Sequence, residues 1–242
     1  GSVSSSSIAA FCLRKARVVF YLKSTENSIT SALLQSKKHI VQLANKFVVF
    51  ENAVDPKDIS LRINMSSVGI LWAASTQPWK RIDKFVEAFA QLEQRQQEQM
   101  SAYRGNICYL GDLHNDVATR VDQINTLTMH QDPQNYDQLR SQSSIFVSTS
   151  ENEPFGLAIL EAMLAGLVIV IPSDNAYWDQ QLVDGVDCIK YHPDQIDCLS
   201  QVLSELIIDQ DLRYRLAKNS QAIAKNYTQP EHYKRIVNSL VN

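Results

Sequence analysis

Residues 145–172 read IFVSTSENEPFGLAILEAMLAGLVIVIP, and this stretch decides the fold. Its pattern predicts a strand at Ile145–Ser148, a helix at Gly156–Ala165 and a second strand at Leu167–Ile171. Gly166 suits the position that follows a helix C-terminus. A strand, a helix and another strand in this order form a βαβ unit, in which the two strands are parallel.

The same alternation of strands and helices continues on both sides of this unit, from about residue 67 onward. Apolar runs predict further strands at Val68–Trp72, Ile107–Leu110 and Cys188–Tyr191. Apolar spacings of three and four predict helices at Lys80–Gln94, Gln195–Ile208, Gln210–Asn226 and Glu231–Val241. The sequence therefore predicts an α/β fold, a parallel sheet flanked by helices.

The N-terminal part carries a weaker pattern. Two strands are predicted at Val18–Leu22 and Phe47–Phe50, with a polar-rich helix at Ser24–Ala44 between them. The serine-rich Gly1–Ser7 is expected to be a frayed end or a cloning remnant outside the fold.

Composition and charge narrow the class of protein. The chain has 242 residues, of which 45% are hydrophobic and 20% charged, as in ordinary globular proteins. The net charge of −3 disfavours a nucleic-acid partner, because proteins that neutralise phosphate backbones are usually basic. The four cysteines have no metal-ligand spacing, which favours a reducing compartment, and no apolar run is long enough to cross a membrane.

Several common catalytic motifs do not occur in the sequence. There is no G-x-G-x-x-G segment and no P-loop, and Ser150 lacks the G-x-S-x-G context of a serine hydrolase. The five histidines show no metal-ligand spacing. A dinucleotide-dependent dehydrogenase, a P-loop nucleotidase and a serine hydrolase are therefore disfavoured.

Three loops each follow a predicted strand: Ala73–Trp79, Gly111–Asp116 and Thr149–Phe155. Ligands of parallel α/β sheets bind beyond the carboxyl ends of the strands, so we expect any site to lie in these loops.

Glu161 is the only charged residue in the otherwise apolar helix that begins at Gly156. A helix that is apolar all round is buried, and a buried carboxylate needs hydrogen-bond donors. The donors could be structural, namely backbone N–H groups or an arginine, or they could be hydroxyl groups of a ligand. Gly156 lets a ligand approach the helix N-terminus, which favours anions, and Glu153 before it could accept sugar hydroxyls.

Lys80 and Arg81 lie at the start of the predicted helix Lys80–Gln94. Positive charges at a helix N-terminus oppose the helix dipole. One interpretation is that they pair with Asp83 or Glu87 one turn on. The other is that a bound phosphate supplies the missing negative charge.

Glu153 and Glu161 are separated by seven residues, and the segment around them resembles the E-x7-E motif of family 4 (group 1) glycosyltransferases. Other segments resemble that family in the same order: Glu51–Asp55 its hinge, Trp79–Phe89 its lysine-bearing helix, and Val183–Gly185 a later turn. The resemblance covers roughly residues 47–241.

The resemblance implies the C-terminal, Rossmann-like half of a GT-B enzyme that transfers a sugar with retention, without a metal or other cofactor. Its donor would be a nucleotide-diphosphate sugar of UDP or GDP type, and its acceptor a glycan or a lipid-linked molecule. Glu153 and Lys80 would be the catalytic pair, with Glu153 facing the donor sugar and Lys80 neutralising the diphosphate. The remaining donor-binding set would be Glu161 on the ribose, Phe155 and Gly156 through their N–H groups, and Arg81, Ser150 and Pro154.

Two of the sequence's departures from the family pattern motivate a second hypothesis. Ser75 stands where the family has an arginine, and Gln180 where it has an acidic residue. We therefore keep open a second hypothesis, a non-catalytic glycosyltransferase-like scaffold or interaction domain.

The resemblance also implies a division of the chain. Residues 1–46 would hold the end of an N-terminal acceptor domain, 47–226 the donor-binding domain and 227–242 a C-terminal helix. Most of the acceptor domain would belong to a longer chain, so the 242 residues alone are expected to have little activity. We expect a cytoplasmic protein, with peripheral contact to the inner face of a membrane through Lys37, Lys38, His39 and Lys46.

Overall fold

The computed structural model describes residues 3–34, 45–60, 63, 68–96, 102–228, 233–234 and 237–238. They belong to two compact units. The smaller comprises Gly1–Ala53 with Gln229–Asn242, and the larger comprises Val54–Thr228. The predicted division at residues 46 and 226 concerns functional domains and stays a prediction.

The larger unit is built on a parallel sheet of six strands. The strands are β3 (Val68–Ser75), β4 (Tyr103–Leu110), β5 (Leu127–Gln131), β6 (Ile145–Val147), β7 (Val168–Pro172) and β8 (Ile189–Tyr191). Their order across the sheet is β5-β4-β3-β6-β7-β8. The chain moves outward from β3 to one edge and then returns to start β6 on its other side. The carboxyl ends of β3 and β6 are therefore the topological switch point, where such sheets bind ligands.

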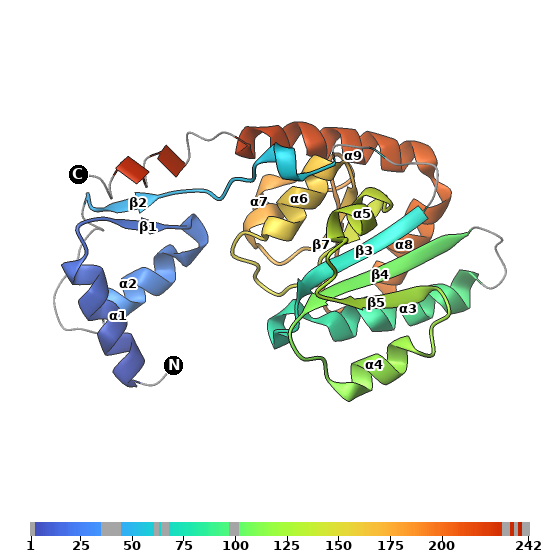
Figure 1. The fold of residues 1–242 in the computed structure, drawn as a ribbon, viewed down its shortest axis with the longest axis horizontal. Coiled ribbons are helices and arrows are strands. Elements are labelled where there is room, and N and C mark those ends of the chain that lie inside the picture. Colours follow the sequence, from blue (N-terminus) through green and yellow to red (C-terminus); the bar gives the residue numbers. More distant parts are fainter. Residues whose placement is uncertain are drawn as a thin grey trace. The chain divides into compact units, whose positions relative to one another are not determined.

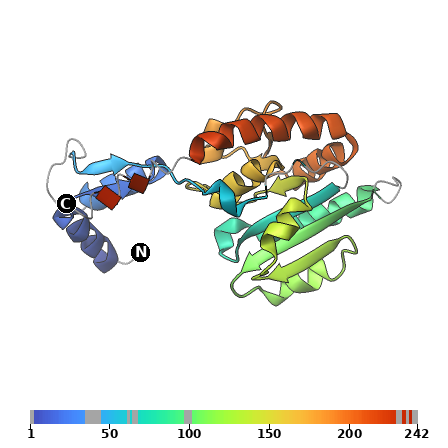
Figure 2. The same ribbon diagram turned by 45° about the horizontal axis from the view of Figure 1, so that its top comes forward.

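Helices cover the sheet on two faces (Figures 1 and 2). On one face lie α3 (Ile82–Gln96), α4 (Asn115–Val121) and α8 (Ile196–Ile208). On the other lie α5 (Tyr136–Ser141), α6 (Leu157–Ala165) and α9 (Gln210–Ala224), and the short α7 (Tyr177–Gln181) connects β7 to β8. This arrangement confirms the predicted α/β fold, a Rossmann-like parallel sheet flanked by helices.

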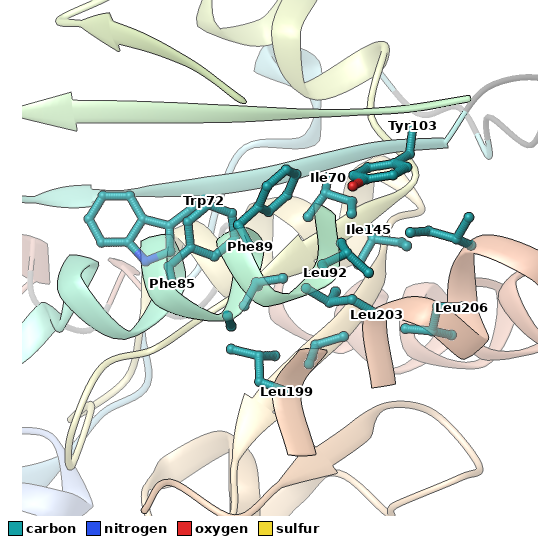
Figure 3. Packing of buried hydrophobic residues seen from close by; sticks show 14 of the residues in the cluster. Ile70, Trp72, Phe85, Phe89, Leu92, Tyr103, Ile145, Leu199, Leu203 and Leu206 are labelled. Carbon is teal, nitrogen blue, oxygen red and sulfur yellow. The ribbon is translucent and has the colours of Figure 1, made fainter. Parts of the chain in front are cut away.

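The core lies between the sheet and the helices α3 and α8 (Figure 3). Phe85, Phe89 and Leu92 of α3 are fully buried, at the spacing of three and four that the sequence shows. Phe85 packs beside Trp72 of β3, and Phe89 lies between Phe85 and Tyr103. Burial of each such side chain contributes roughly 1.5–3 kcal/mol, which fixes α3 and the loop that precedes it against the sheet.

The smaller unit contains α1 (Val3–Lys15), β1 (Val19–Tyr21), α2 (Glu26–Leu34) and β2 (Phe47–Val49), with β1 and β2 parallel. Lys46 donates to the carbonyl oxygens of Leu13, Arg14 and Ala16, so its ammonium closes the C-terminus of α1. The Tyr233 hydroxyl joins the far end of the chain to Ala53, accepting from its N–H and donating to its carbonyl.

The predicted strands and major helices are found in the described parts of the chain, with ends that differ by a few residues. Of the predicted helix Ser24–Ala44, α2 covers Glu26–Leu34, and residues 35–44 lie outside the described residues. Three elements between β4 and β6 were not predicted, namely α4, β5 and α5. The prediction that Gly1–Ser7 lies outside the fold is wrong from Val3 onward, because α1 begins there. Most of the predicted helix Glu231–Val241, and the basic residues Lys37, Lys38 and His39, lie outside the described residues.

Candidate functional site

Lys80 and Glu153 meet at the switch point of the sheet. Lys80 ends the short 3₁₀ helix Pro78–Lys80 after β3, and Glu153 lies in the loop after β6. The Lys80 ammonium donates to Glu153 Oε2, and the two side chains are only 15% and 12% exposed. The structure thus brings the two predicted catalytic residues together as a shielded ion pair.

The indole of Trp79 packs against the ammonium of this ion pair. The Lys80 Nζ lies 3.8 Å from the centroid of the Trp79 ring, within the range of a cation–π interaction. The Trp79 carbonyl accepts a 2.8 Å hydrogen bond from the N–H of Glu151. The loops after β3 and β6 are therefore joined by backbone as well as by charge.

A buried threonine fixes the backbone of Lys80. Thr149 Oγ1 donates to the Lys80 carbonyl at 2.8 Å and accepts from Trp72 Nε1 at 2.9 Å. Trp72 and Thr149 are 1% and 2% exposed. The position of Lys80 is therefore set by the hydrophobic core, through one hydroxyl group.

Arg81 is used within the protein. Its backbone is left-handed, with φ of 50°, and it directs the guanidinium onto Asp83 and Glu151. Burial would raise the pKa of Asp83, but the hydrogen bond from Arg81 holds it below the usual range. Pairing with Asp83 matches the structural alternative that the sequence left open, and a role of Arg81 toward phosphate stays a prediction.

Lys84 strengthens the same ion-pair cluster. Its Nζ lies 3.3 Å from Glu151 Oε1 and donates to the Pro193 carbonyl at 2.8 Å. Because Arg81 and Lys84 both bind Glu151, this carboxylate keeps a lowered pKa in spite of its partial burial. The cluster anchors the loop after β6 to the start of α3.

The start of α6 depends on the glycine that precedes it. Gly156 has φ of 76°, in the left-handed region that glycine adopts without strain. A Cβ atom at this position would lie 2.9 Å from Glu153 Cγ and from Ile159 Cδ1. The absence of a side chain thus gives room to Glu153 next to the helix N-terminus, where the first N–H groups have no acceptor within the helix.

Phe155 is buried rather than presented to the site. Its ring is 2% exposed and packs against Tyr177, Trp178 and Tyr227. Ser150 is also buried, at 4% exposed, and lies in the wall of a small pocket with Glu153. The predicted contribution of Phe155 through its backbone N–H stays a prediction, as do the contributions of Ser150 and Pro154.

Glu161 has a partner that the sequence analysis did not name. Arg140 of α5 donates from Nη1 to Glu161 Oε2 at 2.8 Å, and its side chain is 4% exposed. Burial raises the pKa of Glu161 above its ordinary value, and the Arg140 charge opposes that shift. An arginine was one of the structural donors considered for this carboxylate, but no sequence spacing connects residues 140 and 161.

Two classes of feature are not found in the described part of the chain. No group of three or more histidine, cysteine, aspartate or glutamate side chains there could hold a metal ion. Within the described ranges, no helix is long and apolar enough to cross a membrane.

Comparison with solved structures shows the fold. The structure of Anabaena HepE in complex with UDP and glucose matches with a TM-score of 0.76 and 18% identity, over 100% of this chain and 68% of HepE. A mutant of S. aureus TarM in complex with fondaparinux, alpha-GlcNAc-glycerol and UDP matches with a TM-score of 0.75 and 17% identity, over 95% of this chain and 45% of that one.

An isolated domain matches as well. The C-terminal domain of the group 1 glycosyl transferase LpcC from Francisella tularensis has a TM-score of 0.61 and 18% identity, over 73% of this chain and 99% of that domain. No curated protein matches the sequence.

These structures share the GT-B, Rossmann-like architecture described above. A family model described as glycosyl transferases group 1 matches residues 53–223, which is more than half of the chain. The chain therefore belongs to the group 1 glycosyl transferases.

Proposed function

We propose that this chain binds a nucleotide-diphosphate sugar, of UDP or GDP type, as the donor of a group 1 glycosyltransferase. The observation that carries the proposal is the shielded Lys80–Glu153 pair at the switch point, beside the N-terminus of α6. A lysine and a helix N-terminus together form a site for a diphosphate, and an adjacent carboxylate suits sugar hydroxyls.

The individual roles follow from this arrangement. Lys80 exchanges part of its contact with Glu153 for the diphosphate and stabilises the charge that develops on the leaving group. Glu153 then accepts hydrogen bonds from the donor sugar. Glu161, further along α6, accepts hydrogen bonds from the ribose, and the Phe155 and Gly156 N–H groups face the diphosphate and the sugar.

The chemistry proposed is transfer with retention to a glycan or lipid-linked acceptor, with Lys80 and the helix N-terminus carrying the charge that other enzymes assign to a metal. The complexes of HepE with UDP and glucose and of TarM with UDP support a nucleotide donor. Because the chain spans 45% of the TarM chain and 68% of HepE, the rest of the cleft would come from an N-terminal domain of a longer chain. We expect the 242 residues alone to have little activity.

Calorimetric titration with UDP and GDP tests donor binding directly. One of the two should bind, and Glu161→Ala should weaken that binding by roughly tenfold or more, as for loss of a hydrogen bond to a charged group. Glu93→Ala, on α3, removes a partly buried carboxylate that binds Thr126, away from the site. It is the matched control and should bind as tightly as the unchanged chain. Absence of binding of either nucleotide would contradict the proposal.

A second function is favoured by one specific observation. Ser75 replaces a family arginine, and the adjacent Arg81 is held by Asp83 and Glu151, so Lys80 is the remaining candidate cation for the diphosphate in the described loops. Loss of the cation at position 75 is what a non-catalytic scaffold domain would be expected to show. Sugar transfer by the longer chain, abolished by Glu153→Ala, would exclude this alternative.

We place the protein in the cytoplasm, at the inner face of the membrane when its acceptor is lipid-linked. Fractionation of cells that express the longer chain tests the location. Recovery of the protein outside the cytoplasmic and inner-membrane fractions would contradict it.

A further inference from the structure

Arg140 is among the most buried charged residues in the described part of the chain, at 3% exposed. A buried guanidinium is costly unless its N–H groups are paired. Its Nη1 donates to Glu161 at 2.8 Å and its Nη2 to Asp137 Oδ1 at 2.6 Å. Its guanidinium carbon Cζ also lies 5.1 Å from the centroid of the Tyr136 ring. The arginine is thus fixed by two carboxylates and an aromatic ring.

Asp137 is held in turn from outside α5. It accepts from the Ser60 hydroxyl at 2.6 Å and from the Ser60 N–H at 3.3 Å. Each of its two oxygens therefore has a donor on Ser60, and Oδ1 also binds Arg140. The chain of contacts from Ser60 through Asp137 and Arg140 ends at the Glu161 carboxylate.

The Glu161 carboxylate is held on one oxygen and open on the other. Arg140 binds Oε2, whereas Oε1 has no hydrogen-bond donor among the described residues. The Glu161 side chain is 29% exposed, so ligand can reach it. Because a guanidinium has a fixed planar geometry, binding of one oxygen restricts the rotation of the whole carboxylate.

Tyr136 adds a polar group beside this carboxylate. Its hydroxyl is buried and has no hydrogen-bond partner in the described part of the chain. Burial raises the pKa of Tyr136, and the charge of Glu161 raises it further, so the hydroxyl stays protonated next to Glu161. Tyr136 therefore contributes a protonated hydroxyl to the surroundings of the Arg140–Glu161 pair.

We propose that Arg140 is a positioning residue that orients Glu161 for recognition of the ribose hydroxyls of the donor. The inference rests on the proposed function, since it takes a nucleotide as the ligand. It adds that selection of ribose over deoxyribose is set by a buried side chain that need not touch the nucleotide. Arg140 fixes the direction of Oε1, and the fixed oxygen accepts from a hydroxyl that a deoxyribose lacks.

The experiment compares the affinities of UDP, 2′-deoxy-UDP and 3′-deoxy-UDP by calorimetry for the unchanged chain and for Arg140→Lys. If GDP is the nucleotide that binds, GDP and its 2′-deoxy and 3′-deoxy analogues take their place. The unchanged chain should prefer UDP over one of the deoxy analogues by roughly tenfold or more, as expected for a hydrogen bond to a charged acceptor. Arg140→Lys keeps the charge but loses the planar fork. It should lower this preference to below about threefold, with the affinity for the deoxy analogue unchanged within about twofold.

Arg213→Lys is the matched control. Arg213 is equally buried, at 3% exposed, but it donates to the carbonyl oxygens of Leu206 and Ile207 in the connection between α8 and α9. Both lysine variants are expected to lower the unfolding temperature, because both break contacts of a buried arginine. A merely structural role of Arg140 predicts the same nucleotide preference in both variants, whereas the proposal predicts a loss for Arg140→Lys only.

The outcomes separate this inference from the proposed function. If the unchanged chain binds neither UDP nor GDP, the proposed function fails. If it prefers UDP over a deoxy analogue and Arg140→Lys keeps that preference, the role of Arg140 is overturned while donor binding stands. If the unchanged chain binds UDP without any preference, the ribose contact of Glu161 is contradicted and this inference falls with it.

Asp137→Asn decides the question if Arg140→Lys does not fold. The Asp137 side chain is 45% exposed, so its replacement is tolerated more easily. It removes the ion pair that holds Nη2 while leaving Arg140 in place. A preference for ribose that is reduced severalfold supports the inference, and an unchanged preference overturns it.

Discussion

The indole N–H of Trp72, inside the core, donates to the hydroxyl of Thr149, which itself donates to the carbonyl of Lys80. One hydroxyl group therefore connects the hydrophobic core to the candidate phosphate-binding lysine. The Thr149 hydroxyl both accepts and donates, and its loss removes the partner of the buried Trp72 N–H and of the partly buried Lys80 carbonyl.

Thr149→Val should lower the free energy of unfolding by about 1–3 kcal/mol, the cost of leaving buried donors and acceptors unpaired. Urea denaturation at neutral pH measures the change. Thr119→Val, on the exposed side of α4, replaces a hydroxyl that bonds only within its helix and should change stability by less than about 0.5 kcal/mol. Equal effects of the two substitutions would show that the buried connection contributes nothing.

Lys80→Gln and Glu153→Gln should change UDP affinity in opposite directions. Lys80→Gln removes the cation and should weaken UDP binding by roughly tenfold or more. Glu153→Gln frees the Lys80 ammonium from its ion pair, so UDP should bind a few times more tightly while the advantage of UDP-sugar over UDP falls. Calorimetry with UDP and UDP-glucose measures both changes. Weaker UDP binding by both variants would contradict the expected exchange of partners.

Donor binding should be visible in tryptophan fluorescence. Trp72 and Trp178 are 1% and 2% exposed, whereas Trp79 is 37% exposed and lies against the Lys80 ammonium. If the Lys80 ammonium moves toward a diphosphate, the surroundings of the Trp79 ring change. The fluorescence emission of Trp79 should then change as well. A fluorescence titration with the nucleotide that binds should show this change, and Trp79→Phe should abolish it. Persistence of the change in Trp79→Phe would assign it to another tryptophan.

Asp179 should make the stability depend on pH. Burial would raise its pKa, but Lys190 and the N–H of Asn175 hold it below its ordinary value of 3.8. A carboxylate with a lowered pKa stabilises the fold above its ordinary value, and this stabilisation is lost as pH falls through the folded pKa. Asp179→Asn should therefore be less stable than the unchanged chain near pH 7, with the difference shrinking as pH falls below about 4.

Urea denaturation of both chains at pH 7, 5, 4 and 3 measures this difference. Asp116→Asn, which removes an exposed carboxylate of α4, should follow the unchanged chain at every pH. A difference between Asp179→Asn and the unchanged chain that stays constant with pH would contradict the prediction.

The sequence predicted the central part of the fold because its strands are buried on both faces. Val168–Ile171 and Ile70–Trp72 read as uninterrupted apolar runs, and few other structures are compatible with them. The edge strand β5 escaped detection for the opposite reason. Its apolar residues Leu127 and Met129 alternate with the polar Thr128 and His130, but over five residues this alternation is too short to stand out.

The candidate site was predicted residue by residue, but its supporting contacts were not. Lys80 and Glu153 were named as the catalytic pair from the resemblance to the family, and the structure places them in contact. Arg140 could not be named, because its contact with Glu161 depends on how α5 packs against α6. The spacing of residues along the sequence does not indicate that packing. The direction of Arg81 likewise follows from its left-handed backbone, which a sequence motif does not reveal for a non-glycine residue.

The missing side chain at Gly156 excludes other residues from that position, whatever acid stands at 153. Any Cβ at 156 would lie against the Glu153 side chain, 2.9 Å from its Cγ, and would push the carboxylate away from Lys80. A library that varies position 156 alone should therefore return glycine. A shorter acid at 153 would not admit alanine or asparagine at 156, because aspartate keeps a Cγ atom and Ile159 Cδ1 also lies 2.9 Å from the added Cβ. The left-handed backbone, with φ of 76°, further favours glycine at this position.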